Sequence, residues 1–268
     1  MIPKKLVFHI YAYDSETYFD NIAYKFHMQC LKRYSQLFNK ACFNISCDNI
    51  NNIKQIQQIK HDLINCGFND IEIIVTENDC YCEANTFKYF ILDRLGTDNH
   101  LCFFAHTKGI CNVIDGINYP ENILHWVYTM YFCNLEYFYV QNMEKHLIHS
   151  IGGKKNTFYG TLKNSDEYGS YYSGTFYWIN VLKLYEDNKQ GRIVIPKIFN
   201  RNFCEELPQI YFDKDDPNNN VASFWDVTNA TEWLYNDNDW NDIALKLTLN
   251  EETVEYYNNV YNNMRSNI

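Results

Sequence analysis

Residues 101–110 read Leu-Cys-Phe-Phe-Ala-His-Thr-Lys-Gly-Ile, an apolar run that stops abruptly in a polar cluster. This pattern is typical of a buried strand that ends in a loop, and α/β proteins bind ligands at such carboxyl ends. His106 can donate or accept a hydrogen bond, Lys108 supplies a compact positive charge, and Gly109 lets backbone approach a ligand closely. The stretch therefore predicts a phosphate-binding loop, with an ordinary solvated turn after a strand as the alternative.

The first half of the chain alternates strand and helix patterns. Apolar, β-rich segments lie at residues 6–13, 41–47, 71–76 and 101–105. We expect Asp14 or Ser15 to cap the first helix, Gly67 to end the second, and the third to cover residues 84–95. Repeated β-α-β order predicts an α/β fold with a mainly parallel, Rossmann-like sheet that helices cover on both faces.

The second half is less regular. We expect one long aromatic helix from about Pro120 to His149 and a last helix over residues 251–264. A short strand is predicted at 157–162, a tight aromatic turn at 171–178, and a loop at 213–220. Because no repeat or flexible linker divides the chain, the sequence predicts a single domain over residues 1–268.

Composition excludes several function classes. A formal net charge of -10 and a pI near 5.2 argue against nucleic-acid partners and an anionic membrane surface. The ten cysteines are scattered, and the Cys80/Cys82 pair lacks the spacing of a zinc site, so we expect a reduced, cytoplasmic protein. No run is long enough for an integral membrane span. The 23 Tyr and 18 Phe leave a homo-oligomer open.

Several short motifs occur in a distinctive order. They are Glu77-Asn78, Glu83-Ala-Asn-Thr86, Phe104 to Gly109, Trp126 and Ser173-Gly-Thr-Phe-Tyr-Trp178. The order resembles a glycosyltransferase family whose members carry an HTKG element and a later SGNFWW-like element, and it is distantly similar to the rhamnan-synthesis glycosyltransferases. The resemblance covers about residues 1–210 and implies a GT-A fold that uses a nucleotide-diphosphate sugar. Thr175 and Tyr177 depart from the family's frequent Asn and Trp, which puts the sugar specificity in question.

The resemblance divides the domain into a nucleotide-sugar-binding half, residues 1–115, and an acceptor-side half, residues 116–268. The ends of the first strands lie where a base and ribose bind in a doubly wound sheet. The residues predicted to bind the nucleotide sugar are Tyr11, Tyr13, Asp14, Asp48, Asn78, Glu83, His106, Thr107, Lys108 and Gly109. The alternatives are a helix cap for Asp14, a turn residue for Asp48 and a favourable helix start for Glu83.

The acceptor side offers hydroxyls, close backbone and aromatic rings. The residues predicted to bind sugar or acceptor are Tyr172, Ser173, Gly174, Thr175 and Trp178, although core packing is the favoured role for Trp178. Glu205 and Glu206 are the catalytic candidates, because a carboxylate can take the acceptor proton in an inverting single displacement. For one of these two glutamates, a surface position on a helix is the favoured interpretation.

Many GT-A enzymes carry a metal-binding DxD motif where this chain has His106 and Lys108. Either these two neutralise the diphosphate, or a divalent metal, Mn²⁺ or Mg²⁺, uses other ligands. Asp213-Lys-Asp215 and Asp237-Asn-Asp239 match the spelling, but both are typical of solvated acidic turns. We therefore expect a hexosyltransferase that moves sugar from a UDP-linked donor to a glycan or glycolipid acceptor. The alternatives are a nucleotidyltransferase and a catalytically inactive carbohydrate-binding or interaction protein on the same scaffold.

Overall fold

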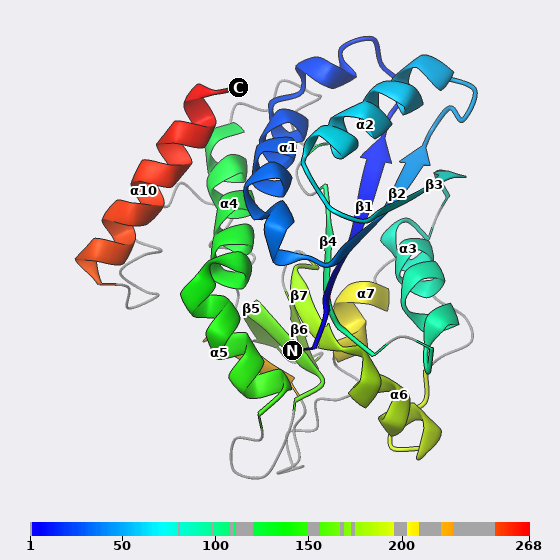
Figure 1. The fold of residues 1–268 in the computed structure, drawn as a ribbon, viewed down its shortest axis with the longest axis vertical. Coiled ribbons are helices and arrows are strands. Elements are labelled where there is room, and N and C mark those ends of the chain that lie inside the picture. Colours follow the sequence, from blue (N-terminus) through cyan, green and yellow to red (C-terminus); the bar gives the residue numbers. More distant parts are fainter. Residues whose placement is uncertain are drawn as a thin grey trace.

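Four parallel strands form one half of the sheet (Figure 1). β1 (Lys4–Ala12) pairs on one side with β2 (Lys40–Cys47) and on the other with β4 (Leu101–His106), while β3 (Ile71–Glu77) pairs with β2. The computed structural model describes residues 2–79, 81–97, 99–107, 110, 120–149, 156–166, 169–172, 175–195, 203–208, 221–227 and 250–268. β1 to β4 coincide with the four apolar runs of the first half of the chain, so the four strands predicted from these runs are confirmed.

Strands from the second half of the chain extend the same sheet. β7 (Tyr177–Asn180) runs antiparallel to β4, and β5 (Phe158–Asp166) runs antiparallel to both β7 and β6 (Gly169–Tyr172). β8 (Val221–Val227) pairs parallel with β5, so the order is β3-β2-β1-β4-β7-β5-β6 with β8 beside β5. The prediction of an α/β fold with a mostly parallel sheet is confirmed.

Helices cover both faces, and each face has its own core (Figure 1). Alternate residues of β1 explain this, because Leu6, Phe8 and Ile10 enter one core and Val7 enters the other. The first face carries α1 (Ile22–Tyr34), α2 (Ile53–Asn65), α4 (Pro120–Leu135), α5 (Tyr137–Leu147) and α10 (Glu251–Ser266). The second carries α3 (Glu83–Phe90), α6 (Val181–Lys189) and α7 (Phe203–Glu206). Within the described ranges, no helix is both long and apolar enough to cross a membrane.

The first helix begins later than the sequence predicts. Asn21, rather than Asp14 or Ser15, caps α1, since its side-chain oxygen accepts hydrogen bonds from the amides of Ala23 and Tyr24. A 3-10 turn, η1 (Tyr18–Asp20), fills the interval. Gly67 follows the end of α2 with a left-handed φ of 84°, as predicted. Gly96 also has a left-handed φ, of 85°, but α3 already stops at Phe90, before the predicted end at residue 95.

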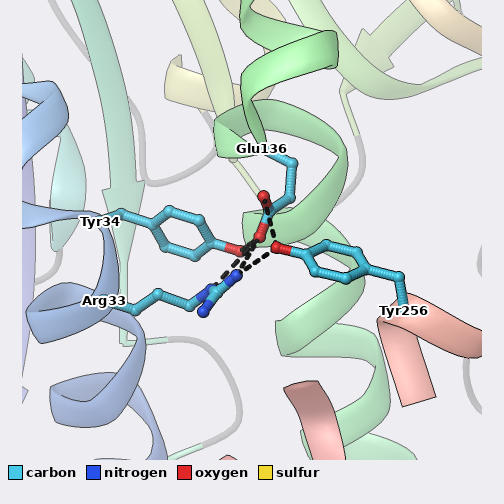
Figure 2. Close-up of polar contacts among 4 residues, drawn as sticks. All are labelled: Arg33, Tyr34, Glu136 and Tyr256. Carbon is cyan, nitrogen blue, oxygen red and sulfur yellow. Dashed lines mark hydrogen bonds and ion pairs between the residues drawn. The ribbon is translucent and has the colours of Figure 1, made fainter. Parts of the chain in front are cut away.

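The predicted long aromatic helix is two helices that meet at Glu136. This residue has an extended backbone, with φ -66° and ψ 145°, which ends α4 and starts α5. Its side chain is largely buried and accepts hydrogen bonds from Arg33 Nη2 (2.8 Å), Tyr34 Oη (2.8 Å) and Tyr256 Oη (3.2 Å) (Figure 2). Partial burial is the largest single influence on Arg33 and lowers its pKa, but the hydrogen bonds and charges of Glu136 and Tyr34 together outweigh burial and raise that pKa.

The Glu136 cluster joins segments that lie far apart in sequence. Arg33 and Tyr34 end α1, Glu136 joins α4 to α5, and Tyr256 lies on α10. Beside the cluster, Tyr261 of α10 stacks on His125 of α4 with ring centroids 3.8 Å apart. α10 is therefore held on the first face by a polar cluster and by aromatic packing.

Replacing Glu136 with alanine should lower the free energy of unfolding by about 3 kcal/mol, because it leaves the Arg33 charge and the buried Tyr34 hydroxyl without their acceptor. Urea denaturation measures the loss. Asp93→Ala is the matched control, since Asp93 pairs with Lys88 where both side chains are about half exposed, and it should contribute less than about 1 kcal/mol. Equal losses in the two variants would contradict the importance of the Glu136 cluster.

Candidate functional site

The carboxyl ends of β1, β2, β3 and β4 meet at one edge of the sheet, because these four strands are parallel. β7 begins at the same edge, since it runs antiparallel to β4. The registers place His9 between Asn44 and His106, and Tyr11 beside Ser46. Four separate stretches of sequence therefore deliver polar residues to one crevice, the strand-end crevice, as α/β folds commonly do.

Asp48 lies at the centre of one cluster in this crevice. Its Oδ2 accepts a hydrogen bond of 2.8 Å from Tyr11 Oη, and its Oδ1 accepts one of 2.9 Å from Asn78 Nδ2. Ser46 Oγ donates to Asn78 Oδ1 at 3.3 Å, which orients that amide. Asp48 is exposed and each of its oxygens has further lone-pair capacity, so the oriented carboxylate can accept hydrogen bonds from a ligand.

Thr107 fastens the end of β4 to β1. Its Oγ1 accepts a hydrogen bond from the Tyr11 amide, and its own amide donates to the His9 carbonyl, both at 3.0 Å. Thr107 is buried, so its role in the structure is to hold these two strand ends together. His106, one residue earlier, is partly exposed, whereas the predicted phosphate contacts Lys108 and Gly109 lie outside the described residues.

Tyr13 and Asp14 make no hydrogen bond to Tyr11, Asp48 or Asn78 among the described interactions, although the rings of Tyr13 and Tyr11 lie 6.2 Å apart. Tyr13 is 8% exposed, its hydroxyl accepts from Asn21 Nδ2 and its carbonyl accepts from Gln55 Nε2, so it occupies a core position. Asp14 is exposed and accepts hydrogen bonds from Asn49 and Asn52, which lower the pKa of its carboxyl. The structure thus joins Tyr11, Asp48 and Asn78 by hydrogen bonds, whereas Tyr13 and Asp14 have other hydrogen-bond partners.

A buried polar chain beneath α3 was missed by sequence reasoning. Thr76 Oγ1 donates to Asn44 Oδ1 at 3.1 Å, and Asn44 Nδ2 donates to Thr86 Oγ1 at 2.8 Å. Thr86 Oγ1 lies 2.8 Å from His9 Nδ1. Thr86 Oγ1 carries one hydrogen and two lone pairs, so it can accept from Asn44 and either donate to or accept from His9 Nδ1.

His9 is neutral at physiological pH. Complete burial lowers its pKa to about 4, and nearby His106 adds to this effect, while the charges of Glu83 and Asp79 oppose it. Glu83 lies in the first turn of α3 and is partly exposed. The missed signal was an alternation of polar residues on one face of three neighbouring strand ends, His9, Asn44 and Thr76, inside otherwise apolar runs.

The residues predicted to contact sugar or acceptor lie around the start of β7. Trp178 is completely buried, donates from Nε1 to the Asn134 carbonyl and stacks on Phe38, so it has the packing role that the sequence favoured. Thr175 is buried with a left-handed φ of 56°, an unusual conformation for a β-branched residue.

The remaining catalytic and acceptor candidates are only partly described. Tyr172 ends β6, and Glu205 and Glu206 belong to α7, whereas Ser173 and Gly174 lie outside the described residues. α7 packs beside α3, with the rings of Phe203 and Phe87 5.8 Å apart. It therefore lies on the same face of the sheet as the buried polar chain.

No metal-binding arrangement is found within the described part of the chain: no three or more His, Cys, Asp or Glu residues lie together as a metal site would require. Asp213, Asp215, Asp237 and Asp239, which spell DxD, all lie outside that part. The crevice as described offers hydroxyl, amide, imidazole and carboxylate groups, which suit a polar ligand with several hydrogen-bonding groups.

Comparisons of the chain with protein-family models, with curated proteins and with solved structures returned no match. The functional proposal therefore rests on the chemistry of the strand-end crevice and on the order of motifs in the sequence.

The buried His9 should make stability depend on pH. The pKa of His9 is about 4 in the folded protein, whereas an unfolded chain has the ordinary histidine pKa of 6.5. Between these values the unfolded state holds more protons, so the free energy of unfolding should fall on acidification, by up to ~1.4 kcal/mol per pH unit. His9→Gln should remove this component.

Urea unfolding of wild type and variant at several pH values between these limits measures the difference. His61→Gln is the matched control, because His61 is exposed and its replacement should leave the wild-type pH dependence intact. Parallel curves for wild type and His9→Gln would show that His9 is not held neutral by the fold.

Proposed function

We propose that the protein is a GT-A-type glycosyltransferase that transfers a sugar from a nucleotide-diphosphate sugar, UDP-linked, to a glycan or glycolipid acceptor. The observation that carries this proposal is the Tyr11–Asp48–Asn78 cluster at the carboxyl ends of neighbouring parallel strands, beside the end of β4. The ordered motifs that resemble a glycosyltransferase family support it, because Asn78 of this cluster belongs to one of them and His106, at the end of β4, to another.

Asp48 would bind the nucleoside portion of the donor. Its carboxylate only accepts hydrogen bonds, and Tyr11 and Asn78 hold it in place. Hydroxyl and N–H groups are the partners that such a carboxylate prefers, and a nucleoside offers both. Since the cluster is already oriented by protein hydrogen bonds, little side-chain freedom would be lost when the donor binds.

The diphosphate would lie at the end of β4. With His9 neutral, Lys108 and, when protonated, His106 would supply positive charge to the departing nucleoside diphosphate. A divalent metal, Mn²⁺ or Mg²⁺, remains open as a further source of charge, so turnover should be assayed with and without manganese. Glu83, at the start of α3, would border the same region.

Glu205 or Glu206 would activate the acceptor. One carboxylate would take the proton of the acceptor hydroxyl. The oxygen of that hydroxyl would bond to the anomeric carbon of the donor sugar, while the bond from this carbon to the diphosphate breaks and the nucleoside diphosphate leaves with its electrons. The packing of α7 against α3 supports this role, because α3 begins with Glu83, which is also proposed to border the donor. The segment 172–175, which enters β7, would orient the sugar and the acceptor.

The affinities of variants for uridine and for UDP distinguish the proposed nucleoside contact, Asp48, from the proposed diphosphate contact, Lys108. Asp48→Ala should weaken both uridine and UDP by roughly ten- to a hundredfold, because a hydrogen bond to a charged group is lost. Lys108→Ala should weaken UDP by about tenfold through loss of one charged contact and leave uridine unchanged. Isothermal titration calorimetry measures both ligands.

Asp70→Ala is the matched control, since Asp70 is an exposed carboxylate that precedes β3 at the opposite edge of the sheet. It should bind both ligands as wild type does. Wild-type protein that is folded but binds neither uridine nor UDP would exclude the proposed donor class.

Turnover tests the proposed base. Glu205→Gln or Glu206→Gln should lower transfer or donor hydrolysis by roughly 10²- to 10⁴-fold while UDP affinity stays unchanged. Product release from a nucleotide-sugar panel is the measurement. If both folded variants keep near-normal turnover, the base lies elsewhere; if wild type binds UDP but turns over no donor, the catalytically inactive alternative is favoured.

A further inference from the structure

A groove of about 1160 Å³ lies between α1 and α2, on the face of the sheet opposite α3 (Figure 1). It starts at the loop that follows β1, where Asp14 to Glu16 form one end, and continues along the two helices to Cys66. A second groove of about 540 Å³, between α1 and α10, shares three lining residues with it. The surface is therefore hollowed on both sides of α1. We call the larger hollow the α1/α2 groove.

Carboxamide side chains make up a large part of the polar lining of the α1/α2 groove, beside an equal number of charged side chains. The carboxamides are Gln29, Asn52, Gln55, Gln58, Asn65 and Asn267. A carboxamide offers a donor and an acceptor side by side, and a hydroxyl group likewise donates and accepts. A row of carboxamides therefore complements a ligand that carries many hydroxyl groups.

Several of these amides have hydrogen-bonding capacity left. Gln29 makes no side-chain hydrogen bond within the described residues, and Gln58 uses its Nε2 toward Asp62 Oδ1 at 2.8 Å. Gln55 is 95% buried; its Nε2 donates to the Tyr13 carbonyl, but its Oε1 has no donor among the described groups. An unsatisfied buried acceptor is destabilising, and a ligand hydroxyl could supply the missing donor once the Gln55 side chain shifts, because its Oε1 has almost no accessible surface in the free protein.

The groove also has an aromatic surface. Phe19 lines it and is partly exposed, and its ring is held by edge contacts to Tyr18 (5.2 Å) and Tyr24 (5.7 Å). Tyr24 is in turn fixed by a hydrogen bond from its hydroxyl to Asp62 Oδ2. A positioned ring of this kind accepts the C–H face of a sugar while neighbouring amides bind its hydroxyls.

The charge of the groove points to a neutral ligand. The lining contains three lysines, Lys25, Lys32 and Lys54, and three acidic residues, Asp14, Glu16 and Asp62. These formal charges cancel, although the whole chain carries -10. A site for phosphate or sulfate groups would instead concentrate positive charge.

We propose that the α1/α2 groove binds a neutral oligosaccharide chain. The volume exceeds what a single small ligand fills, so several sugar units would lie along the two helices. The residues that line the groove do not include Tyr11, Asp48 or Asn78, so this site is distinct from the strand-end crevice, and binding there needs no nucleotide. The groove would contact several consecutive sugar units of one glycan chain, and this binding would not depend on the proposed transfer reaction.

Direct binding to the full chain tests this inference, with neutral hexasaccharides of glucose, galactose, mannose, rhamnose and N-acetylglucosamine as probes. We expect saturable binding of at least one hexasaccharide by calorimetry, and no loss of affinity at raised salt, because no ligand charge is involved. A complete lack of saturable binding at millimolar concentrations overturns the proposal. So does preference for a sulfated oligosaccharide over the neutral ones.

Two neighbouring glutamines on α2 give a matched pair of variants. Gln58→Ala should weaken the hexasaccharide by about fivefold or more, through loss of a hydrogen-bonding group that lines the groove. Gln57→Ala should have no effect, because Gln57 is exposed outside the groove. Phe19→Ala should weaken binding further, provided that urea denaturation shows it to be folded. Unchanged affinity in both Gln58→Ala and folded Phe19→Ala overturns the assignment.

Uridine diphosphate is titrated into the same variants. Its affinity should not change, since neither Gln58 nor Phe19 belongs to the Tyr11–Asp48–Asn78 cluster. A protein that binds the hexasaccharide but not UDP supports the groove and contradicts the proposed transferase. A protein that binds UDP but not the hexasaccharide contradicts the proposed groove site and does not contradict the transferase proposal.

Discussion

Parallel pairing of β1 with both of its neighbours is the constraint on which the rest of the structure depends. Because β2 and β4 follow the direction of β1, the loops after all three strands emerge at one edge. The two faces of β1 then serve different purposes: Phe8 and Ile10 supply one apolar core, while His9 enters a hydrogen-bonded chain on the other. A shift of one residue in register would exchange these two sets.

The strand-end crevice and the α1/α2 groove show two ways of presenting polar groups. In the crevice, Asp48 is fixed by hydrogen bonds from Tyr11 and Asn78, which favours recognition of one ligand geometry. In the groove, Gln29 and Gln58 are helix side chains with fewer internal partners. Such groups adapt to a repeating ligand more readily than they discriminate between similar ones.

The strands and the first strand-end residues could be predicted because their signals are local. Continuous apolar runs identify strands that are buried on both faces, and Asp48 and Asn78 follow such runs directly. The break at Glu136 could not be predicted, since its partners Arg33 and Tyr256 lie about a hundred residues away on either side in sequence. The capping by Asn21 and the polar chain through Thr86 likewise depend on packing between elements.

The left-handed backbone of Thr175 bears on the order in which this edge of the sheet forms. Asparagine tolerates a φ value such as that of Thr175 better than a β-branched residue does. The local preference of Thr175 therefore opposes the turn that leads into β7. The turn must be imposed from outside, by the pairing of β7 with β4 and by the burial of Phe176 and Trp178. This entry to the crevice is consequently completed only after the neighbouring strands have assembled.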